Sequence, residues 1–285
     1  MQKIWVCGAR GQIGQAVNDV VDKLEFEMLD TDVDDLDVTD TDEVLRFGEM
    51  NSPDIIINCS GMTDISSCEE NPSQAFKVNA LGARNLAIVA AKMQAKMVQL
   101  STDDVFDGKS TEPYTEFDIT NPGTVYGKSK LAGENYVKEF TTKHFIVRST
   151  WVYGKGQNFI NGFLKKVDAG EQLSIASDQF GSPTSANELA RFLLHLVHTS
   201  EYGTYHATNK GVCSRYAFAQ EILKMTGKTA SMQPVPTVMS DFSKVRPAYA
   251  VLDNFIMSMV PIYDFPDWQD SLREYLEERG LYHAE

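Results

Sequence analysis

The 285-residue sequence has no long uninterrupted apolar stretch and no run of basic residues. A membrane-spanning helix needs about 20 mostly apolar residues, so we expect no transmembrane segment. Lysine and arginine (26) are outnumbered by aspartate and glutamate (40), which gives a formal net charge of −14. Such an acidic chain is a poor partner for nucleic acid or for an anionic membrane. The start shows no signal-peptide pattern, which predicts a cytoplasmic location.

Cysteine is scarce as well. The four cysteines are scattered and show no paired spacing of the kind that binds metals: Cys7, Cys59, Cys68 and Cys213. In a reducing compartment such residues stay free thiols. We therefore predict neither a metal site nor a disulfide framework, and the sequence shows no internal repeat.

The first half of the chain alternates short apolar stretches with helical ones. Strands are expected at 3–7, 25–29, 54–58, 96–101 and 144–148. Strand–helix alternation with continuous apolar strands predicts an α/β fold with a doubly wound parallel Rossmann sheet. In such sheets ligands bind outside the carboxyl ends of the strands, so functional residues are expected there.

The alternation becomes irregular after about residue 150. We predict a dinucleotide-binding Rossmann domain over residues 1–150 and a smaller α+β substrate-binding lobe over residues 151–285, which includes a strand at 203–207. The helix at about 184–199 is expected to pack back on the first domain.

The first strand runs into a glycine turn with the spacing Gly8-x-x-Gly11-x-x-Gly14, followed by a helix. Glycines let the backbone approach a pyrophosphate, and the helix N-terminus offers free N–H groups to it. Asp30 lies 22 residues beyond Gly8, near the place of the carboxylate that binds an adenosine ribose. Asp30 and Asp32 disfavour a 2′-phosphate, whereas Arg10 favours one, so the choice between NADH and NADPH stays open.

The stretch YGKSK places Tyr126 and Lys130 one helical turn apart on the same face. A phenol titrates near about 10, and a neighbouring ammonium stabilises the phenolate and lowers that value. The pair is therefore a candidate acid/base, and Thr102 at the end of the strand before it is a candidate partner.

Together these features resemble the dTDP-4-dehydrorhamnose reductase family of extended short-chain dehydrogenase/reductases. The similar segments extend from residue 8 to about residue 269 and are GARGQIG, STDDVFDG, YGKSKLAGE, RSTWVYG, QNFI, DQFGSPTSANELA, the Arg246-Pro247 pair and PDWQ.

The resemblance implies a role for each matching residue. Tyr126 would donate the proton, Lys130 would lower its pKa and bind the nicotinamide ribose, and Thr102 would bond the substrate carbonyl. The residues implied to bind the cofactor, besides Asp30, Tyr126 and Lys130, are Gly8, Gly11, Gln12, Ile13 and Gly14 at the pyrophosphate, Asp37 and Val38 at the adenine, and Cys59, Ser60, Gly61 and Thr63 along its path. Those implied to bind the substrate are Ile65, Asp104 and Trp151 at the sugar, and Asn158, Gln179 and Arg246 at the nucleotide diphosphate.

The implied reaction is hydride transfer from NADPH or NADH to the C4 keto group of a nucleotide-linked 4-dehydro-6-deoxy sugar. The expected substrate is dTDP-4-dehydro-L-rhamnose, reduced to dTDP-L-rhamnose for cell-surface polysaccharide precursors. The nucleotide-sugar is the expected partner of a monomer or homodimer.

The sequence departs from the family at Asp104, where an aromatic residue is usual, and at Met62. The acidic pair Asp103 and Asp104 allows an alternative, a nucleotide-sugar dehydratase or epimerase that uses these carboxylates. A second alternative is a non-catalytic regulatory subunit resembling that of methionine adenosyltransferase.

Overall fold

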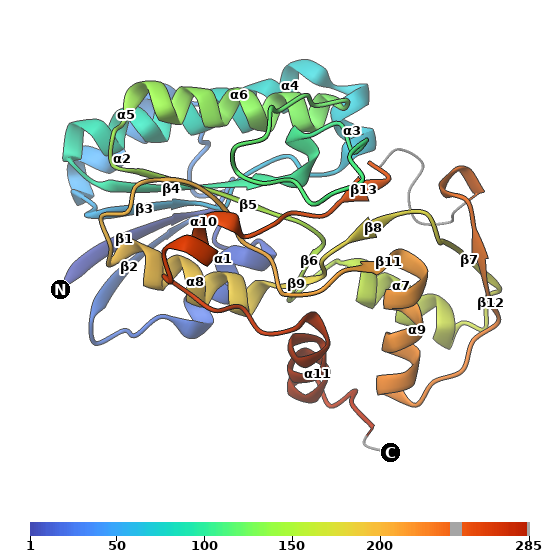
Figure 1. Cartoon of the computed structure of the whole chain (residues 1–285). Helices are drawn as coiled ribbons and strands as arrows, with labels where there is room; N and C mark the ends of the chain where they lie inside the picture. Colours follow the sequence, from blue (N-terminus) through green and yellow to red (C-terminus); the bar gives the residue numbers. More distant parts are fainter. Residues whose placement is uncertain (240–246, 284–285) are drawn as a thin grey trace.

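The computed structural model describes residues 1–239 and 247–283. A parallel sheet with the strand order β2-β1-β3-β4-β5-β10 lies at its centre, with helices on both faces (Figure 1). Its strands are β1 (Gln2–Cys7), β2 (Phe26–Thr31), β3 (Ile55–Asn58), β4 (Lys96–Thr102), β5 (His144–Ser149) and β10 (Gly203–His206). The predicted doubly wound parallel sheet is confirmed.

Alternating side chains along the strands fill a core on each face of the sheet. Ile4 and Val6 pack into one core, and Trp5 and Cys7 into the other. The first core is covered by α1 (Gln12–Val20) and α8 (Ala186–Val197), and the second by α2 (Thr41–Asn51), α5 (Ala83–Met93) and α6 (Val125–Phe140). Because both faces are covered, strands such as β3 are apolar at successive positions.

The sixth strand comes from far along the chain. The stretch at 203–207 was expected in the second lobe, but β10 pairs in parallel with β5, with Tyr205 opposite Val147. Helix α8 also packs against α1. The chain after residue 150 thus contributes to both parts of the molecule, and the division into 1–150 and 151–285 stays a prediction.

The stretch between β3 and β4 is a helix interrupted by a π-helical turn. It consists of α4 (Pro72–Phe76), the π-helical turn η1 (Lys77–Gly82) and α5. Short π-helical turns inside helices are frequent near functional sites. Here the turn carries Asn79, a buried amide, toward the start of α6.

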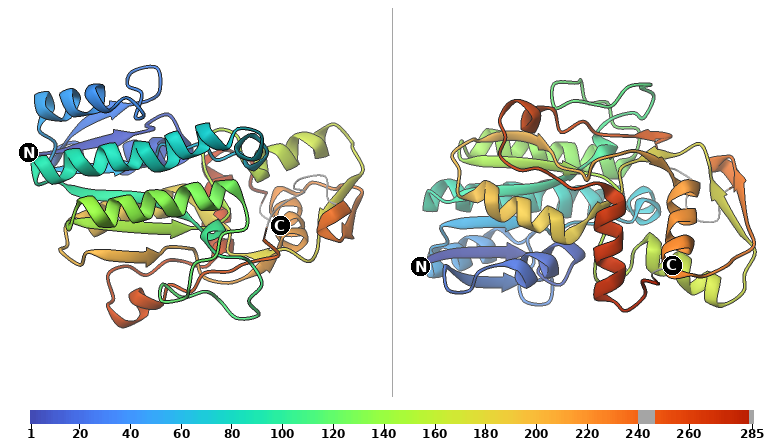
Figure 2. Two further views of the ribbon diagram at one scale, coloured as in Figure 1. Left: turned by 90° about the horizontal axis from the view of Figure 1, so that it is seen from above. Right: turned by 60° about the horizontal axis from the view of Figure 1, so that its bottom comes forward.

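A third core, containing Phe163, Phe218 and Trp268, defines a smaller lobe beside the sheet. Figure 2 shows that the elements after residue 150 lie to one side of the sheet, except for α8, β10 and α10. The elements not yet named are α3 (Ile65–Glu70), η2 (Asp103–Val105), β6 (Val152–Tyr153), α7 (Phe159–Asp168), β7 (Leu173–Ala176), β8 (Phe180–Gly181), β9 (Thr184–Ser185), β11 (Cys213–Ser214), α9 (Arg215–Thr226), β12 (Met232–Val235), η3 (Thr237–Met239), β13 (Tyr249–Ala250), α10 (Phe255–Met259) and α11 (Trp268–Glu278).

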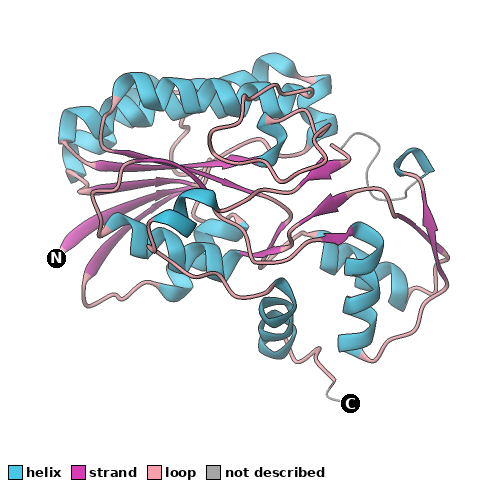
Figure 3. Cartoon of the chain, viewed as in Figure 1, coloured by secondary structure: helices cyan, strands magenta, loops and turns pink. Residues whose placement is uncertain are grey.

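Figure 3 shows that the strands of the central sheet end on the side that faces the smaller lobe. Within the described ranges, every helix is too short or too polar to span a bilayer. In the same ranges, no group of three or more His, Cys, Asp or Glu side chains is placed to hold a metal ion.

Two helical glycines test how tightly α6 is packed. A Cβ at Gly133 in α6 would overlap the backbone carbonyl oxygen of Asn79, whereas a Cβ at Gly162 in α7 would meet open space. We expect Gly133→Ala to lower the free energy of unfolding by about 1–3 kcal/mol through overpacking. Gly162→Ala should raise it by up to about 1 kcal/mol because alanine has the higher helix propensity. Urea unfolding measures both, and equal effects would contradict the close contact.

Candidate active site

The candidate site lies where the strand order reverses, with β2 on one side of β1 and β3 on the other. Open α/β sheets bind ligands outside the carboxyl ends of the strands at such a point. Two cavities of about 430 and 520 Å³ open there. They share the lining residues Gly11, Cys59, Ser60 and Gly61. The two adjoining cavities are therefore treated as one groove.

The glycine turn forms the floor between the two cavities. Gly8 has a φ of +75°, and a Cβ on it would lie 2.8 Å from the backbone nitrogen of Ser60. A Cβ on Gly14 would overlap the carbonyl oxygen of Gly8. Helix α1 follows with Gly11 at its N-cap and no side-chain cap, which leaves N–H groups at its N-terminus for an anion.

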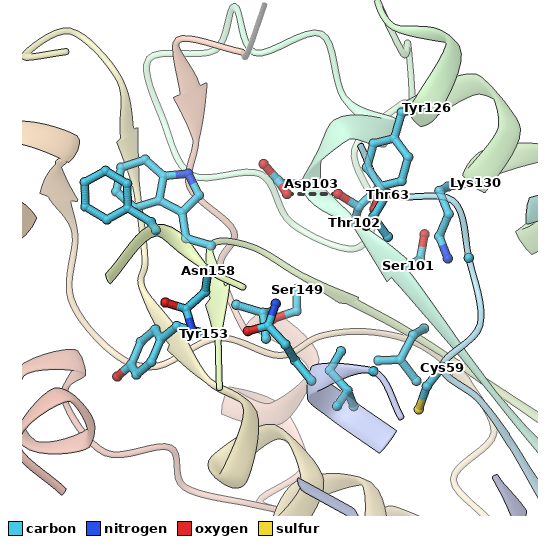
Figure 4. Close-up of a pocket in the computed structure, with 18 of the residues that line it drawn as sticks. Cys59, Thr63, Ser101, Thr102, Asp103, Tyr126, Lys130, Ser149, Tyr153 and Asn158 are labelled. Atoms are coloured by element: carbon cyan, nitrogen blue, oxygen red, sulfur yellow. Dashed lines mark hydrogen bonds between the residues drawn. The ribbon is translucent and has the colours of Figure 1, made fainter. Parts of the chain in front are cut away.

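Tyr126 and Lys130 both line the 430 Å³ cavity from the first turns of α6, together with Thr102 from the end of β4 (Figure 4). The helix starts close to the strand end because Gly127 has no side chain: a Cβ there would overlap the carbonyl oxygen of Asp104. The Thr124 hydroxyl caps the helix by accepting a 2.9 Å bond from the Gly127 N–H. The predicted Thr, Tyr and Lys therefore converge on one cavity.

Lys130 has only 5% of its surface exposed. Burial lowers its pKa from 10.5 to about 8, although the negative charge of Glu134 acts in the opposite direction. Below pH 8 the buried ammonium destabilises the folded state by roughly 3 kcal/mol. The side chain thus places a poorly solvated positive charge at the cavity that Tyr126 also lines.

A buried ion pair holds α6 to the sheet. Glu134 accepts two bonds from the Arg148 guanidinium, at 2.9 and 2.7 Å, and a third from the Ser101 hydroxyl at 2.6 Å. These three residues belong to α6, β5 and β4. The pair fixes the helix that carries Tyr126 against the strand end that carries Thr102.

Asn79 was missed by the sequence reasoning because it belongs to no motif. Its amide accepts a 2.8 Å bond from the Met62 N–H and donates a 2.9 Å bond to the Met62 carbonyl. It also donates to the Ser129 hydroxyl at 2.9 Å, next to Lys130. Asn79 therefore connects the loop at Met62 to the helix that carries Tyr126 and Lys130.

The structure brings most of the predicted residues to the groove. Those lining the 430 Å³ cavity are Gly11, Gln12, Ile13, Cys59, Ser60, Gly61, Thr63, Thr102, Tyr126, Lys130, Trp151 and Asn158. Those lining the 520 Å³ cavity are Gly8, Gly11, Asp37, Val38, Cys59, Ser60 and Gly61.

The structure does not bring five predicted residues to the groove: Gly14, Asp30, Ile65, Asp104 and Gln179. Arg246 lies outside the described residues.

Two of these differences have a clear geometric origin. The role of Asp104 at the sugar stays a prediction: its side chain is 1% exposed, and its neighbour Asp103, the first residue of the turn η2, lines the cavity. Asp30 is exposed and still within β2, which ends at Thr31. Asp32 and Asp37 are the carboxylate residues that line the 520 Å³ cavity. Asp32 accepts a 2.9 Å bond from the Arg10 N–H.

The groove fits a dinucleotide. The Gln12 Oε1 and Ser149 Oγ atoms are buried without a hydrogen-bond partner among the described residues, and both side chains line the 430 Å³ cavity. Buried polar atoms are normally bonded, so such orphans are sites for a ligand's polar groups. They line the same cavity as Lys130, which suits the polar groups of NADH or NADPH, and the glycine turn suits the pyrophosphate.

A parallel sheet with a glycine turn at its switch point, and Thr, Tyr and Lys around the adjoining cavity, is the arrangement of the short-chain dehydrogenase/reductases. Comparison with known proteins identifies the group within this class. Residues 1–280 match the profile of the family described as RmlD substrate binding domain, and the chain belongs to this family. The predicted resemblance is confirmed.

Three known proteins illustrate the similarity. The spore coat polysaccharide biosynthesis protein SpsK of Bacillus subtilis is 35% identical over 281 residues, which cover 98% of this chain and 99% of SpsK. The crystal structure of a dTDP-4-dehydrorhamnose reductase from Clostridium acetobutylicum is 40% identical with a TM-score of 0.95, covering 98% and 100% of the two chains. The dTDP-4-dehydrorhamnose reductase from Bacillus anthracis, whose crystal structure is a complex with NADP, is 35% identical to this chain in sequence. The two structures superpose with a TM-score of 0.94 and cover 98% and 100% of the two chains.

The lowered pKa of Lys130 predicts a pH effect on stability. Between pH 8 and 10.5 the unfolded chain binds more protons at this position than the folded one, so the wild type gains stability as the pH rises. Lys130→Met removes this effect. From about pH 7.5 to about pH 9.5 the free energy of unfolding of the wild type should rise by about 2 kcal/mol relative to the variant, measured by urea unfolding.

Lys128→Met, which removes an exposed lysine from the same helix, is the matched control for the loss of a lysine from α6. Parallel pH dependence of the wild type and Lys130→Met would contradict a buried, destabilising ammonium at position 130.

Proposed function

We propose that the protein is an NAD(P)H-dependent reductase of the C4 keto group of a nucleotide-linked 4-dehydro-6-deoxy sugar. The proposed substrate is dTDP-4-dehydro-L-rhamnose, and the product serves cell-surface polysaccharide synthesis. The carrying observation is that Thr102, Tyr126 and Lys130 line one cavity that continues into the groove of the glycine turn. The names of the relatives support the substrate class.

The nicotinamide cofactor, when bound, supplies the hydride. The residues of the chain supply alignment and the proton. Tyr126 protonates the oxygen on which negative charge develops, and the Lys130 ammonium stabilises the resulting phenolate. Thr102 provides a second hydrogen bond to the same oxygen. One donor of this kind lowers the activation free energy by about 3 kcal/mol.

The Thr102 hydroxyl has a single proton, which it donates to Asp103 at 3.0 Å. Donation to a substrate carbonyl therefore requires this hydroxyl to turn from Asp103 into the cavity. Asp103 thus holds the hydroxyl at the cavity wall until the substrate competes for its proton.

The position of Asp104 bears on the alternative reactions. An elimination by Asp103 and Asp104 needs both carboxylates at the substrate, and Asp104 does not line the cavity. The presence of Thr102, Tyr126 and Lys130 together in one cavity favours catalysis over a purely regulatory role. The cytoplasmic location and the monomeric or homodimeric state stay predictions.

The decisive test is oxidation of NADH or NADPH in the presence of dTDP-4-dehydro-L-rhamnose. We expect turnover by the wild type and a loss of about 10²–10⁴-fold in kcat in Tyr126→Phe, because the general acid is gone. Cofactor binding, followed by fluorescence titration, should be retained. Tyr136→Phe, on the same helix but outside the cavity, is the control. Absence of turnover with either cofactor would refute the proposed substrate.

The surroundings of Arg10 predict a preference for NADH. Arg10 and Asp32 both line the 520 Å³ cavity, and the Arg10 guanidinium lies 3.1 Å from Asp34 and 3.5 Å from Asp35. These carboxylates offset the cation that would bind a 2′-phosphate. One unit charge at about 4 Å in water is worth about 1 kcal/mol, or a factor of about five. Asp32→Asn should therefore raise kcat/KM for NADPH relative to NADH about fivefold.

Steady-state kinetics with both cofactors measure this ratio, and Asp270→Asn on α11 is the control for loss of a carboxylate elsewhere. A wild type that favours NADPH, with a ratio unchanged in Asp32→Asn, would contradict the assignment of Asp32 as a determinant of cofactor choice.

A further inference from the structure

Three side chains of the smaller lobe that line the 430 Å³ cavity contact one another. Arg215, the first residue of α9, stacks its guanidinium over the Trp151 ring, with 3.4 Å between the guanidinium carbon and the ring centroid. The same carbon lies 4.7 Å from the centroid of Phe159. All three residues line the cavity.

The position of the stack is fixed from several sides. Trp151 has a φ of +48°, a left-handed conformation that is rare for an aromatic residue. A Cβ on Gly181 would lie 2.6 Å from the Trp151 ring, so this ring packs directly on the Gly181 backbone. The backbone N–H of Arg215 donates a 3.0 Å hydrogen bond to the backbone carbonyl oxygen of Gln179. Backbone strain of this kind is maintained at sites where function needs it.

Arg215 is one of two positively charged residues that line the 430 Å³ cavity in the described part of the chain. In the described part of the chain, the lining residues with a positive charge are Lys130 and Arg215. Lys130 is needed beside Tyr126 at the reaction end. A nucleotide diphosphate carries several negative charges, and the chain as a whole, with a net charge of −14, offers it no general attraction.

Stacking uses the face of a guanidinium, whereas its N–H donors point outward in the plane in a fork that matches phosphate oxygens. We propose that Arg215 binds the diphosphate of the nucleotide-sugar and that its stack on Trp151 orients it for that contact. This inference rests on the proposed function, since it places the nucleotide end of the substrate against the smaller lobe. It adds a binding residue outside the motifs of the sequence.

The test compares two ligands that share a nucleoside and differ in the diphosphate. Calorimetric titration of the full chain with thymidine and with dTDP gives the ratio of their dissociation constants. We expect the wild type to bind dTDP at least about tenfold more tightly than thymidine, and Arg215→Met to lose most of this ratio. Methionine keeps an apolar stem against Trp151, and NADH binding should stay unchanged.

Two further variants secure the interpretation. Arg215→Lys keeps the charge without the fork and should retain part of the discrimination between dTDP and thymidine. Arg273→Met removes an arginine of α11 that pairs with Asp270 at 2.9 Å, away from the cavity, and should change nothing.

Equal weakening of both ligands in Arg215→Met would overturn the proposal, because Arg215 would then only support Trp151. The proposal also fails if the wild type does not bind dTDP more tightly than thymidine. The titration is independent of turnover: a wild type that binds dTDP through Arg215 but oxidises no NADH with the sugar would refute the proposed reaction and leave the diphosphate site intact.

Discussion

The site depends on the close approach of α6 to the sheet end and to the π-helical turn before α5. Gly127 meets the Asp104 carbonyl and Gly133 meets the Asn79 carbonyl, each at a distance that a side chain would prevent. The Glu134–Arg148 pair then fixes the helix to β5. Tyr126 and Lys130 reach the cavity because the helix lies this deep.

Burying such polar groups near a reaction centre has an energetic consequence. A buried ion pair contributes little net stability once desolvation is counted, but removing one partner is strongly destabilising. The Glu134 carboxylate is paired, because it accepts two hydrogen bonds from Arg148 and one from Ser101. Its negative charge also opposes the fall in the pKa of Lys130. The same carboxylate thus positions the helix and keeps the lysine charged near neutral pH.

The sequence was sufficient for features that depend on local spacing, and insufficient for those set by where an element ends. The glycine turn and the pair Tyr126/Lys130 follow from strand–turn–helix and i, i+4 patterns. By contrast, β2 runs to Thr31, past its expected end at residue 29, and Asp32 rather than Asp30 lines the 520 Å³ cavity. Likewise the turn η2 breaks the strand alternation after Thr102, so Asp103 reaches the cavity and Asp104 does not. Arg215 and β10 join the structure through long-range contacts that no local pattern encodes.

Asn79 gives the site a mechanical property. Its one amide bonds both the loop at Met62 and the helix at Ser129, so a shift of either relative to the other breaks hydrogen bonds to Asn79. The loop at the groove and the helix that carries Tyr126 are therefore connected before any ligand arrives. Binding then has less conformational freedom to remove, and more of the interaction free energy remains available for holding the ligands.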